Sequence, residues 1–440
     1  MRGAGTPAQF PARVGPARLT EAWIRFATFA LALALCAPAA RATELGANYN
    51  QYLPDVYNGA LARAGVRWVR GFVNVQRNYL TFDAPNRSVI TGVLEANIAQ
   101  QGDRVSGSAD ILAVQAVDKL IEVKGMKVRG ERLKTILSLK TDFKVGCVEE
   151  KPAACAGVPS VGTPQMRDLV TAIHDRLLAN NLGAYVDILV VGNEPMFETP
   201  VADAARYGEF LDLLVAELVK LRAAQGWGFR IFAGALNKAS TLKQDPILEA
   251  VIDVVNRNPH VDGLDMHLHV DSVGEADADL DFVRNAKGVT KDIITTEFSL
   301  VGLWTQKAED KLGYWGEVRG YPQDTTFRDW LNLLLMRAGD GHPVPPAEFM
   351  SFFRSRYWYT EQWFADFFAV LERHRLLAAT YGLQSTPVVP PLQYKPHALL
   401  WVVNFVWNGS LFGLGPDGFY VDNPIVAPEF ARIAKKQWPQ

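Results

Sequence analysis

The sequence predicts an α/β fold in which parallel strands close into a single (β/α)8 (TIM) barrel. Short runs of β-branched and apolar residues alternate along the chain with segments of helical periodicity. We count about eight such strands, and neither an internal repeat nor a break in composition divides them. Strands that alternate with helices pair in parallel through right-handed crossovers, and about eight of them close into a barrel.

The composition agrees with a large globular domain. Of the 440 residues, 49% are hydrophobic and 21% are charged, so the chain can bury a sizeable core. The formal net charge is −2, which gives no electrostatic basis for binding nucleic acid or an anionic membrane. We therefore expect neither as a partner. We also expect the protein to be a monomer.

The first 42 residues have the features of an export signal. Four arginines precede an apolar stretch at 26–36, and Ala40-Arg41-Ala42 is an A-x-A cleavage signal. The apolar stretch is shorter than the ~20 residues that a membrane span needs. We expect residues 1–42 to be a signal peptide and 43–440 to be a periplasmic or secreted barrel domain. A lipid attached to Cys36 is the alternative.

Export changes the interpretation of the cysteines. Cys147 and Cys155 remain after cleavage, in a loop of Gly, Pro and Ala. An oxidising compartment favours a disulfide between them. Asn86 and Asn408 begin N-x-S/T sequences, which are chance matches unless the source glycosylates its proteins.

The first half of the chain contains four of the predicted strands. They cover residues 45–50, 66–72, 133–140 and 186–191. A helix over 54–64 ends at Gly65, and another begins at Thr163-Pro164, because proline suits the first helical position. We expect an irregular insertion over 77–108, and apolar spacing at 111–121 predicts a helix after it.

The second half contains the other four strands. They cover residues 230–235, 263–270, 292–299 and 376–384. Residues 402–407 are the alternative for strand eight. Helices are expected over 202–224, after Asp245-Pro246 and around 363–371. A long insertion at about 301–360 follows strand seven, and a connection of that length is more often functional than idle.

Two glutamates stand where predicted strands end. The apolar run 186–191 stops at Asn193-Glu194-Pro195, and the proline biases Glu194 away from helical geometry. Glu297 stands at the end of the 292–299 run. The carboxyl ends of parallel strands carry the chemistry of such folds, so we expect a facing pair of carboxyl groups. Taken singly, either residue is more often an ordinary loop glutamate.

The ordered set of motifs resembles clan A of the (β/α)8-barrel retaining glycoside hydrolases. Asn193-Glu194-Pro195 matches the strand-four motif of that clan, and Thr295-Thr296-Glu297-Phe298 matches its strand-seven motif. The resemblance implies that Glu194 is the catalytic acid/base and Glu297 the nucleophile. It also implies a carbohydrate substrate and no cofactor.

The resemblance extends to further residues that would bind substrate or shape the site. Arg70 matches a strand-two arginine that keeps the nucleophile ionised, and Asn193 would hydrogen-bond the sugar 2-hydroxyl. His267 matches a strand-six histidine, whereas His269 stands where the clan often has tyrosine. Tyr381 is a candidate aromatic platform on strand eight. The aromatic residues of the 301–360 insertion, Trp304 among them, are further candidates for stacking on sugar rings.

The predicted function is cleavage of β-glycosidic bonds in a polysaccharide or oligosaccharide by double displacement. Retaining enzymes hold two carboxyl groups ~5 Å apart, of which one attacks the anomeric carbon and the other is protonated. The negative charge of Glu297 is expected to raise the pKa of Glu194.

Two alternatives come from other classes. His267 and His269 lie two apart on a strand, share a face and so fit a metal-dependent hydrolase. A glycan-binding barrel without turnover is the other alternative, although the presence of both glutamates argues against it.

Overall fold

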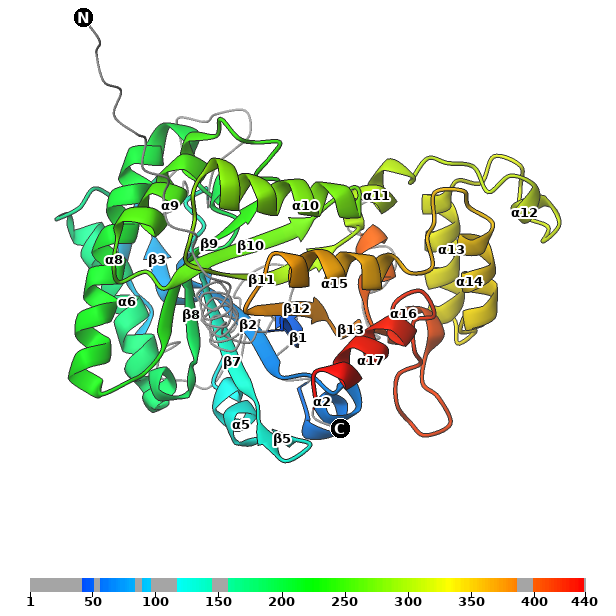
Figure 1. Cartoon of the computed structure of the whole chain (residues 1–440), viewed down its shortest axis with the longest axis horizontal. Helices are drawn as coiled ribbons and strands as arrows, with labels where there is room; N and C mark the ends of the chain where they lie inside the picture. The colour runs from blue at the N-terminus through cyan, green and yellow to red at the C-terminus, as the bar shows by residue number, and fades with distance from the viewer. Residues whose placement is uncertain are drawn as a thin grey trace, which may run out of the picture. The chain divides into compact units, whose positions relative to one another are not determined.

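Eight parallel strands close into a barrel in the computed structural model, which confirms the predicted fold class (Figure 1). The strands are β1 Glu44–Asn50, β2 Trp68–Asn74, β7 Lys134–Lys140, β8 Ile188–Val191, β9 Arg230–Asn237, β10 Gly263–His269, β11 Asp292–Ser299 and β12 Ala378–Gly382. Around the barrel they follow the order β1-β12-β11-β10-β9-β8-β7-β2. Strand eight is therefore the 376–384 segment, and the alternative at 402–407 is wrong.

The structure describes residues 42–50, 56–83, 89–95, 117–144, 157–385 and 399–438. The expected signal peptide, Cys147, Cys155 and the sequence at Asn86 lie outside these residues. Within the described part, no helix combines the length and the apolar character needed to cross a membrane.

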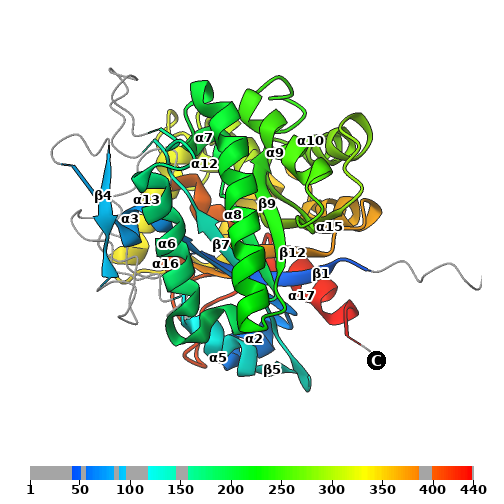
Figure 2. The ribbon, with the colours of Figure 1, turned by 90° about the vertical axis from the view of Figure 1, so that its left-hand side faces the viewer.

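Helices pack around the barrel. They include α2 Asn58–Ala64, α5 Lys119–Gly125, α6 Pro164–Leu178, α8 Ala204–Gln225, α9 Pro246–Arg257, α10 Val273–Asp281, α15 Trp363–Arg373 and α17 Ala427–Lys436. Figure 2 shows α6 and α8 on one side of the barrel. The predicted starts are confirmed, because the Thr163 side chain accepts from Met166 N and that of Asp245 from Ile247 N. Gly65 ends α2 in the left-handed conformation, as expected.

The strands divide the apolar residues between two cores. A large cluster lies between barrel and helices, and a smaller one fills the barrel interior. The interior cluster consists of Trp68, Ile136, Ile188, Val190, Phe232, Ile294, Leu377 and Ala378. Because successive strand residues alternate in direction, Arg70 shares the inward face of β2 with Trp68. Arg70 is the third residue of β2, which continues to Asn74.

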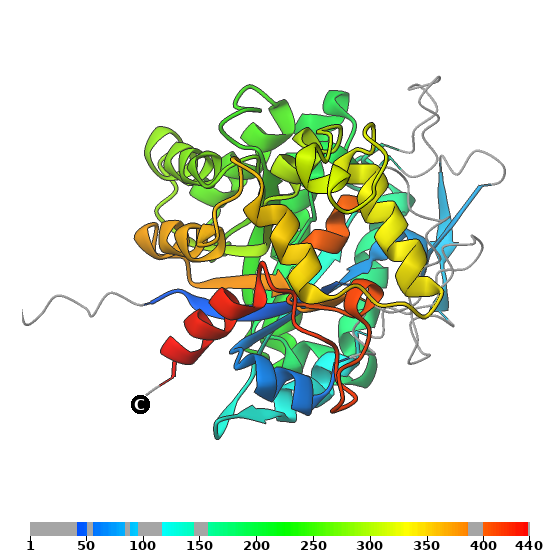
Figure 3. The same cartoon turned by 90° about the vertical axis from the view of Figure 1, so that its right-hand side faces the viewer.

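Both predicted insertions contain regular structure. Residues 77–108 were expected to be irregular, but α3 Val75–Tyr79 leads into an antiparallel pair of β3 Leu80–Phe82 and β4 Ile90–Val93. The 301–360 insertion forms α11 Val301–Gln306, α12 Tyr314–Glu317, α13 Phe327–Gly339 and α14 Pro346–Arg354. It leaves the carboxyl end of β11, and Figure 3 views the molecule from the side of α13 and α14. Rings of Phe327, Trp330, Phe349 and Phe352 pack within it.

The chain after β12 returns to the same end of the barrel. The short 3-10 helix η7 Leu399–Asn404 is followed by β14 Trp407–Asn408, which pairs with β13 Gln384–Ser385. Asn408 is fully buried, and its side chain caps α16 Gly409–Phe412 by accepting from Leu411 N. The N-x-S sequence at Asn408 is therefore not an accessible glycosylation site in the folded chain.

Candidate active site

A strained turn after β8 presents Glu194. The strand ends at Val191, Gly192 has φ 100°, and Glu194 has φ 46° and ψ 51° immediately before α7 Pro195–Glu198. A left-handed conformation is uncommon for a residue with a side chain and gathers at functional sites. Pro195 disfavours the right-handed helical conformation at Glu194, so the helix begins one residue later.

Arg70 holds Glu297 from inside the barrel. Its Nη1 lies 2.7 Å from Glu297 Oε1, and its Nη2 donates to Asn193 Oδ1 at 3.0 Å. The arginine side chain is fully buried, and Nε donates to Ser138 Oγ at 3.1 Å. Burial raises the pKa of Glu297, but the positive charges of His267 and Arg70 outweigh it and hold the pKa well below its usual range. Glu297 is therefore ionised.

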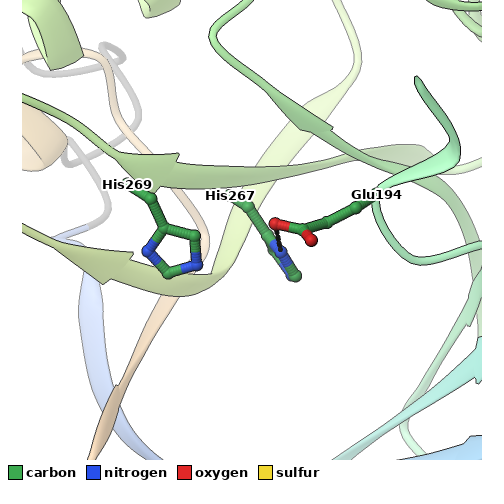
Figure 4. A group of neighbouring side chains, drawn as sticks. All are labelled: Glu194, His267 and His269. Carbon is green, nitrogen blue, oxygen red and sulfur yellow. Dashed lines mark hydrogen bonds and ion pairs between the residues drawn. The ribbon is translucent and has the colours of Figure 1, made fainter. Parts of the chain in front are cut away.

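His267 lies between the two glutamates. Its Nδ1 is 3.2 Å from Glu194 Oε1 (Figure 4). Its Nε2 is 3.8 Å from Glu297 Oε1. Nε2 also hydrogen-bonds Thr296 Oγ1 at 3.1 Å. The Thr296 hydroxyl donates to Asp265 Oδ2 at 2.6 Å, so its oxygen must accept from His267 Nε2–H. Nδ1 is consequently the nitrogen that exchanges a proton with Glu194.

One proton is shared between Glu194 and His267. Burial raises the pKa of Glu194, but the hydrogen bond and charge of His267 outweigh it and lower the pKa to about 2. Burial lowers the pKa of His267, but the carboxylates of Glu297 and Glu194 outweigh burial, so the pKa is raised overall. The proton of the pair therefore rests on the imidazole. We expected the pKa of Glu194 to be raised, and that prediction is wrong because the hydrogen bond and charge of the histidine outweigh the other carboxylate.

His269 contacts the second oxygen of Glu297. Its Nε2 is 3.4 Å from Glu297 Oε2, and its Nδ1 hydrogen-bonds Ser299 Oγ at 2.9 Å. The ring of Trp401 meets the His269 ring edge-on, with centroids 4.8 Å apart. His269, at the position where the resemblance suggested a tyrosine, therefore contacts Glu297 directly.

A cavity opens beside Glu297 at the carboxyl end of the barrel. Its lining residues are Asn48, Tyr49, His269, Glu297, Phe298, Ser299, Gly382, Gln384, Trp401, Asn404 and Phe405. The lining combines an ionised carboxylate with amides and aromatic rings, which is a surface suited to a polar ligand with apolar faces.

Tyr381 and Trp304, two of the expected substrate-binding residues, lie apart from the glutamates and do not line this cavity. Tyr381 is 1% exposed, and its ring packs against Phe298 and Phe364 on the helix side of β12. Trp304 is fully buried, and its Nε1 donates to Asn404 Oδ1 at 2.9 Å. Both interpretations are therefore wrong, because these rings belong to the packing behind the site. The remaining expected residues form one connected cluster, of which His269 and Glu297 line the cavity: Arg70, Asn193, Glu194, His267, His269 and Glu297.

Sequence reasoning missed Trp401, one of the aromatic residues that line the cavity. Trp401 belongs to η7, next to the segment that we considered as an alternative strand, and it faces His269. Asn237 was also missed, although its Nδ2 donates to Glu194 Oε1 at 3.1 Å. Asp265 is a third residue that was missed, and its spacing could have revealed it. Asp265 precedes His267 by two residues, so both side chains lie on the same face of β10.

The same residues include a set that fits a metal ion. One ligand atom each from Glu194, His267 and His269 lie within 4.8 Å of one another. A carboxylate and two imidazoles are a ligand set that zinc accepts. In the described residues, however, His267 Nδ1 already hydrogen-bonds Glu194 and His269 Nδ1 hydrogen-bonds Ser299.

No protein-family model and no curated protein match the chain. Solved structures similar to it include an endo-β-1,6-glucanase, with TM-score 0.46 and 10% identity over 90% of this chain and 76% of the other. An endo-1,4-β-mannanase from Rhizomucor miehei has TM-score 0.45 and 11% identity over 91% and 96%. A thermostable mutant of a xylanase from Cellvibrio japonicus has TM-score 0.45 and 12% identity over 90% and 98%.

Proposed function

We propose that this protein is a retaining glycoside hydrolase that cleaves β-glycosidic bonds in a polysaccharide or oligosaccharide. The observation that carries the proposal is one imidazole in contact with two glutamates, of which Glu297 is held ionised by Arg70 while Glu194 shares a proton with His267. Double displacement requires an ionised nucleophile and a proton for the acid/base glutamate, and the imidazole holds such a proton beside Glu194. We further propose export to the periplasm or medium, a Cys147–Cys155 disulfide and action without a cofactor.

In the first step Glu297 attacks the anomeric carbon and the glycosidic C–O bond breaks. His267 passes its proton to Glu194, and Glu194 gives this proton to the leaving oxygen. A glycosyl ester of Glu297 forms, so Glu297 loses its negative charge. In the second step Glu194 takes a proton from water, the resulting hydroxide equivalent attacks the anomeric carbon, and Glu297 leaves as carboxylate.

The first test compares the wild type with Glu297→Gln on β-glucans, xylans, mannans and galactans by following reducing ends. We expect the wild type to act on one of these classes and the variant to lose at least about a thousandfold in rate. Glu249→Gln is the matched control, because this glutamate lies on α9 outside the barrel and its side chain is 44% exposed. Equal activity of Glu297→Gln and the wild type would contradict the proposal.

A second test separates the two glutamates by stereochemistry. Glu297→Ala should recover turnover with azide and give a glycosyl azide of inverted configuration, since azide enters where the nucleophile was. Glu194→Ala should instead give the azide of retained configuration from an activated aryl glycoside. If the two outcomes were exchanged, the roles of the two glutamates would be reversed. If azide rescued neither variant, the double-displacement mechanism would be contradicted.

The metal-dependent hydrolase is the second candidate, because Glu194, His267 and His269 form a ligand set. It assigns no role to the ion pair of Arg70 and Glu297, which is why we favour the two-carboxylate mechanism. Dialysis against a chelator distinguishes them. Full activity after chelation supports the glutamate pair, whereas loss of activity and recovery with zinc would support the metal site.

A further inference from the structure

A second buried glutamate contacts the site from behind. Glu198 is the last residue of α7, four residues after Glu194, and it is 6% exposed. Its Oε1 accepts from Asn193 Nδ2 at 2.9 Å and pairs with Lys140 Nζ at the end of β7. The proposed mechanism gives no role to either Glu198 or Lys140.

We propose that Glu198 is a positioning residue that holds the amide of Asn193 in the orientation needed for the sugar 2-hydroxyl. This inference rests on the proposed glycosidase function and on the expected hydrogen bond between Asn193 and that hydroxyl. Glu198 does not touch substrate, and it acts through Asn193 alone.

The hydrogen bonds define which way the amide faces. A guanidinium group only donates, so the Arg70 Nη2 contact at 3.0 Å identifies the accepting atom of Asn193 as Oδ1. The NH2 group therefore faces Glu198, and one of its two N–H bonds is used there. Both ends of the amide are held, and the second N–H has no acceptor among the described residues.

The burial of Glu198 is not explained by stability. Burial raises its pKa to about 7 even though Lys140 and Asn193 act in the opposite direction. Its Oε2 is buried and has no hydrogen-bond partner among the described residues. Well-packed apolar side chains in place of such a buried ion pair are often neutral or stabilising. A role in orienting Asn193 therefore accounts for the carboxylate better than stability does.

The experiment uses two substrates and paired variants. The substrates are the 2,4-dinitrophenyl β-glycoside of the sugar found with the polysaccharide panel and the same glycoside with hydrogen in place of the 2-hydroxyl. Lys140→Met/Glu198→Met removes the acceptor and leaves no unpaired charge. Lys140→Met/Glu198→Gln keeps an accepting oxygen without the charge. Asp187→Asn is the control, because Asp187 pairs with Lys124 at the opposite end of β8.

We expect Lys140→Met/Glu198→Met to lose about tenfold in kcat on the parent glycoside and less than about twofold on the 2-deoxy glycoside. Asn193→Ala should show the same selective loss. Lys140→Met/Glu198→Gln should recover most of the parent rate, because the introduced amide oxygen can accept from Asn193. Asp187→Asn should change the rate on neither substrate.

The outcomes separate this inference from the proposed function. Equal losses on both substrates in Lys140→Met/Glu198→Met, while Asn193→Ala remains selective, would overturn the role of Glu198 and leave the glycosidase assignment intact. A wild type that hydrolyses both glycosides equally fast would overturn the Asn193 contact itself. A wild type without glycosidase activity would overturn the proposed function. Thermal melting of each variant verifies that it is folded.

Discussion

At the scale of single residues, the direction of the hydrogen bonds decides which nitrogen of His267 exchanges a proton with Glu194. Asp265 is fully buried, and it accepts from both the backbone N–H and the hydroxyl of Thr296. The threonine oxygen can then only accept from His267. Asp265 and Thr296 therefore keep Nε2 protonated and leave Nδ1 for the exchange with Glu194.

Replacing this hydroxyl should move the pH dependence of the reaction. Thr296→Val removes the acceptor for His267 Nε2–H, so the pKa of the imidazole should fall. Activity needs the shared proton, which is present below the pKa of the Glu194–His267 pair and is lost as pH rises through it. We expect the basic limb of kcat/KM to shift to lower pH by about half to one unit.

Thr296→Ser is the matched control for this measurement, since it keeps the hydroxyl and loses only a methyl group. Its basic limb should stay within about 0.2 units of the wild type. A pH profile of Thr296→Val that coincides with that of the wild type would show that the threonine hydroxyl does not set the proton position.

At the scale of elements, the turn between β8 and α7 positions the catalytic side chains. Gly192 is the residue that makes this turn, with φ 100°. A Cβ there would lie 2.2 Å from Gly234 O and 2.8 Å from the Tyr207 hydroxyl. The close approach of β8 and β9 therefore requires glycine, and Asn193 and Glu194 come directly after it.

Gly192→Ala should damage both stability and activity. We expect a loss of about 3 kcal/mol or more in the free energy of unfolding, because both the backbone conformation and the neighbouring carbonyl oppose the methyl group. Denaturant titration measures the loss, and kcat should fall because Glu194 moves. Gly226→Ala is the control: Gly226 also has positive φ, at 67°, but its Cβ would meet open space. It should cost about 1 kcal/mol, and equal losses at both glycines would contradict the role of the contact.

At the scale of the whole molecule, an ion network at the amino end of the strands helps to close the barrel. Glu44 at the start of β1 accepts from Trp68 Nε1 at 2.6 Å and Arg67 Nη1 at 3.0 Å. Lys134 at the start of β7 reaches its Oε2 at 2.7 Å. Burial raises the pKa of Glu44, but the bonds from Lys134, Arg67 and Trp68 outweigh it and lower the pKa overall.

Glu44→Gln should therefore destabilise the protein in a pH-dependent way. The lowered pKa means that the carboxylate adds stability above its ordinary value of 4.5, and that this part is lost as pH falls through the folded-state pKa. We expect a loss of about 1–2 kcal/mol at pH 7 by denaturant titration, shrinking towards zero in acid.

Glu131→Gln is the control for the network. Glu131 also pairs with Arg67, but its side chain is 53% exposed, so the loss should stay below about 0.5 kcal/mol at every pH. A Glu44→Gln difference that stays constant between pH 7 and strongly acidic solution would indicate lost packing rather than lost charge.

The sequence by itself determined the order of strands and the residues at their ends. Strand runs such as β8, all four of whose residues are buried, are recognised from local composition. Pro195 ends one run and restricts the backbone of the residue before it, so Glu194 could be placed at the carboxyl end of β8 from adjacent residues. Helix starts such as Thr163 are local for the same reason.

Only the tertiary structure decided which side chains meet. Arg70 and Glu297 are 227 residues apart, and they touch because the closed barrel brings β2 and β11 around the same interior. Tyr381 lies on the strand that we predicted but faces the helices, while Trp401 reaches His269 from the chain that returns after β12. Successive side chains of a strand point to opposite faces of the sheet, and this much follows from the sequence. Which face becomes the barrel interior is set by barrel closure and packing.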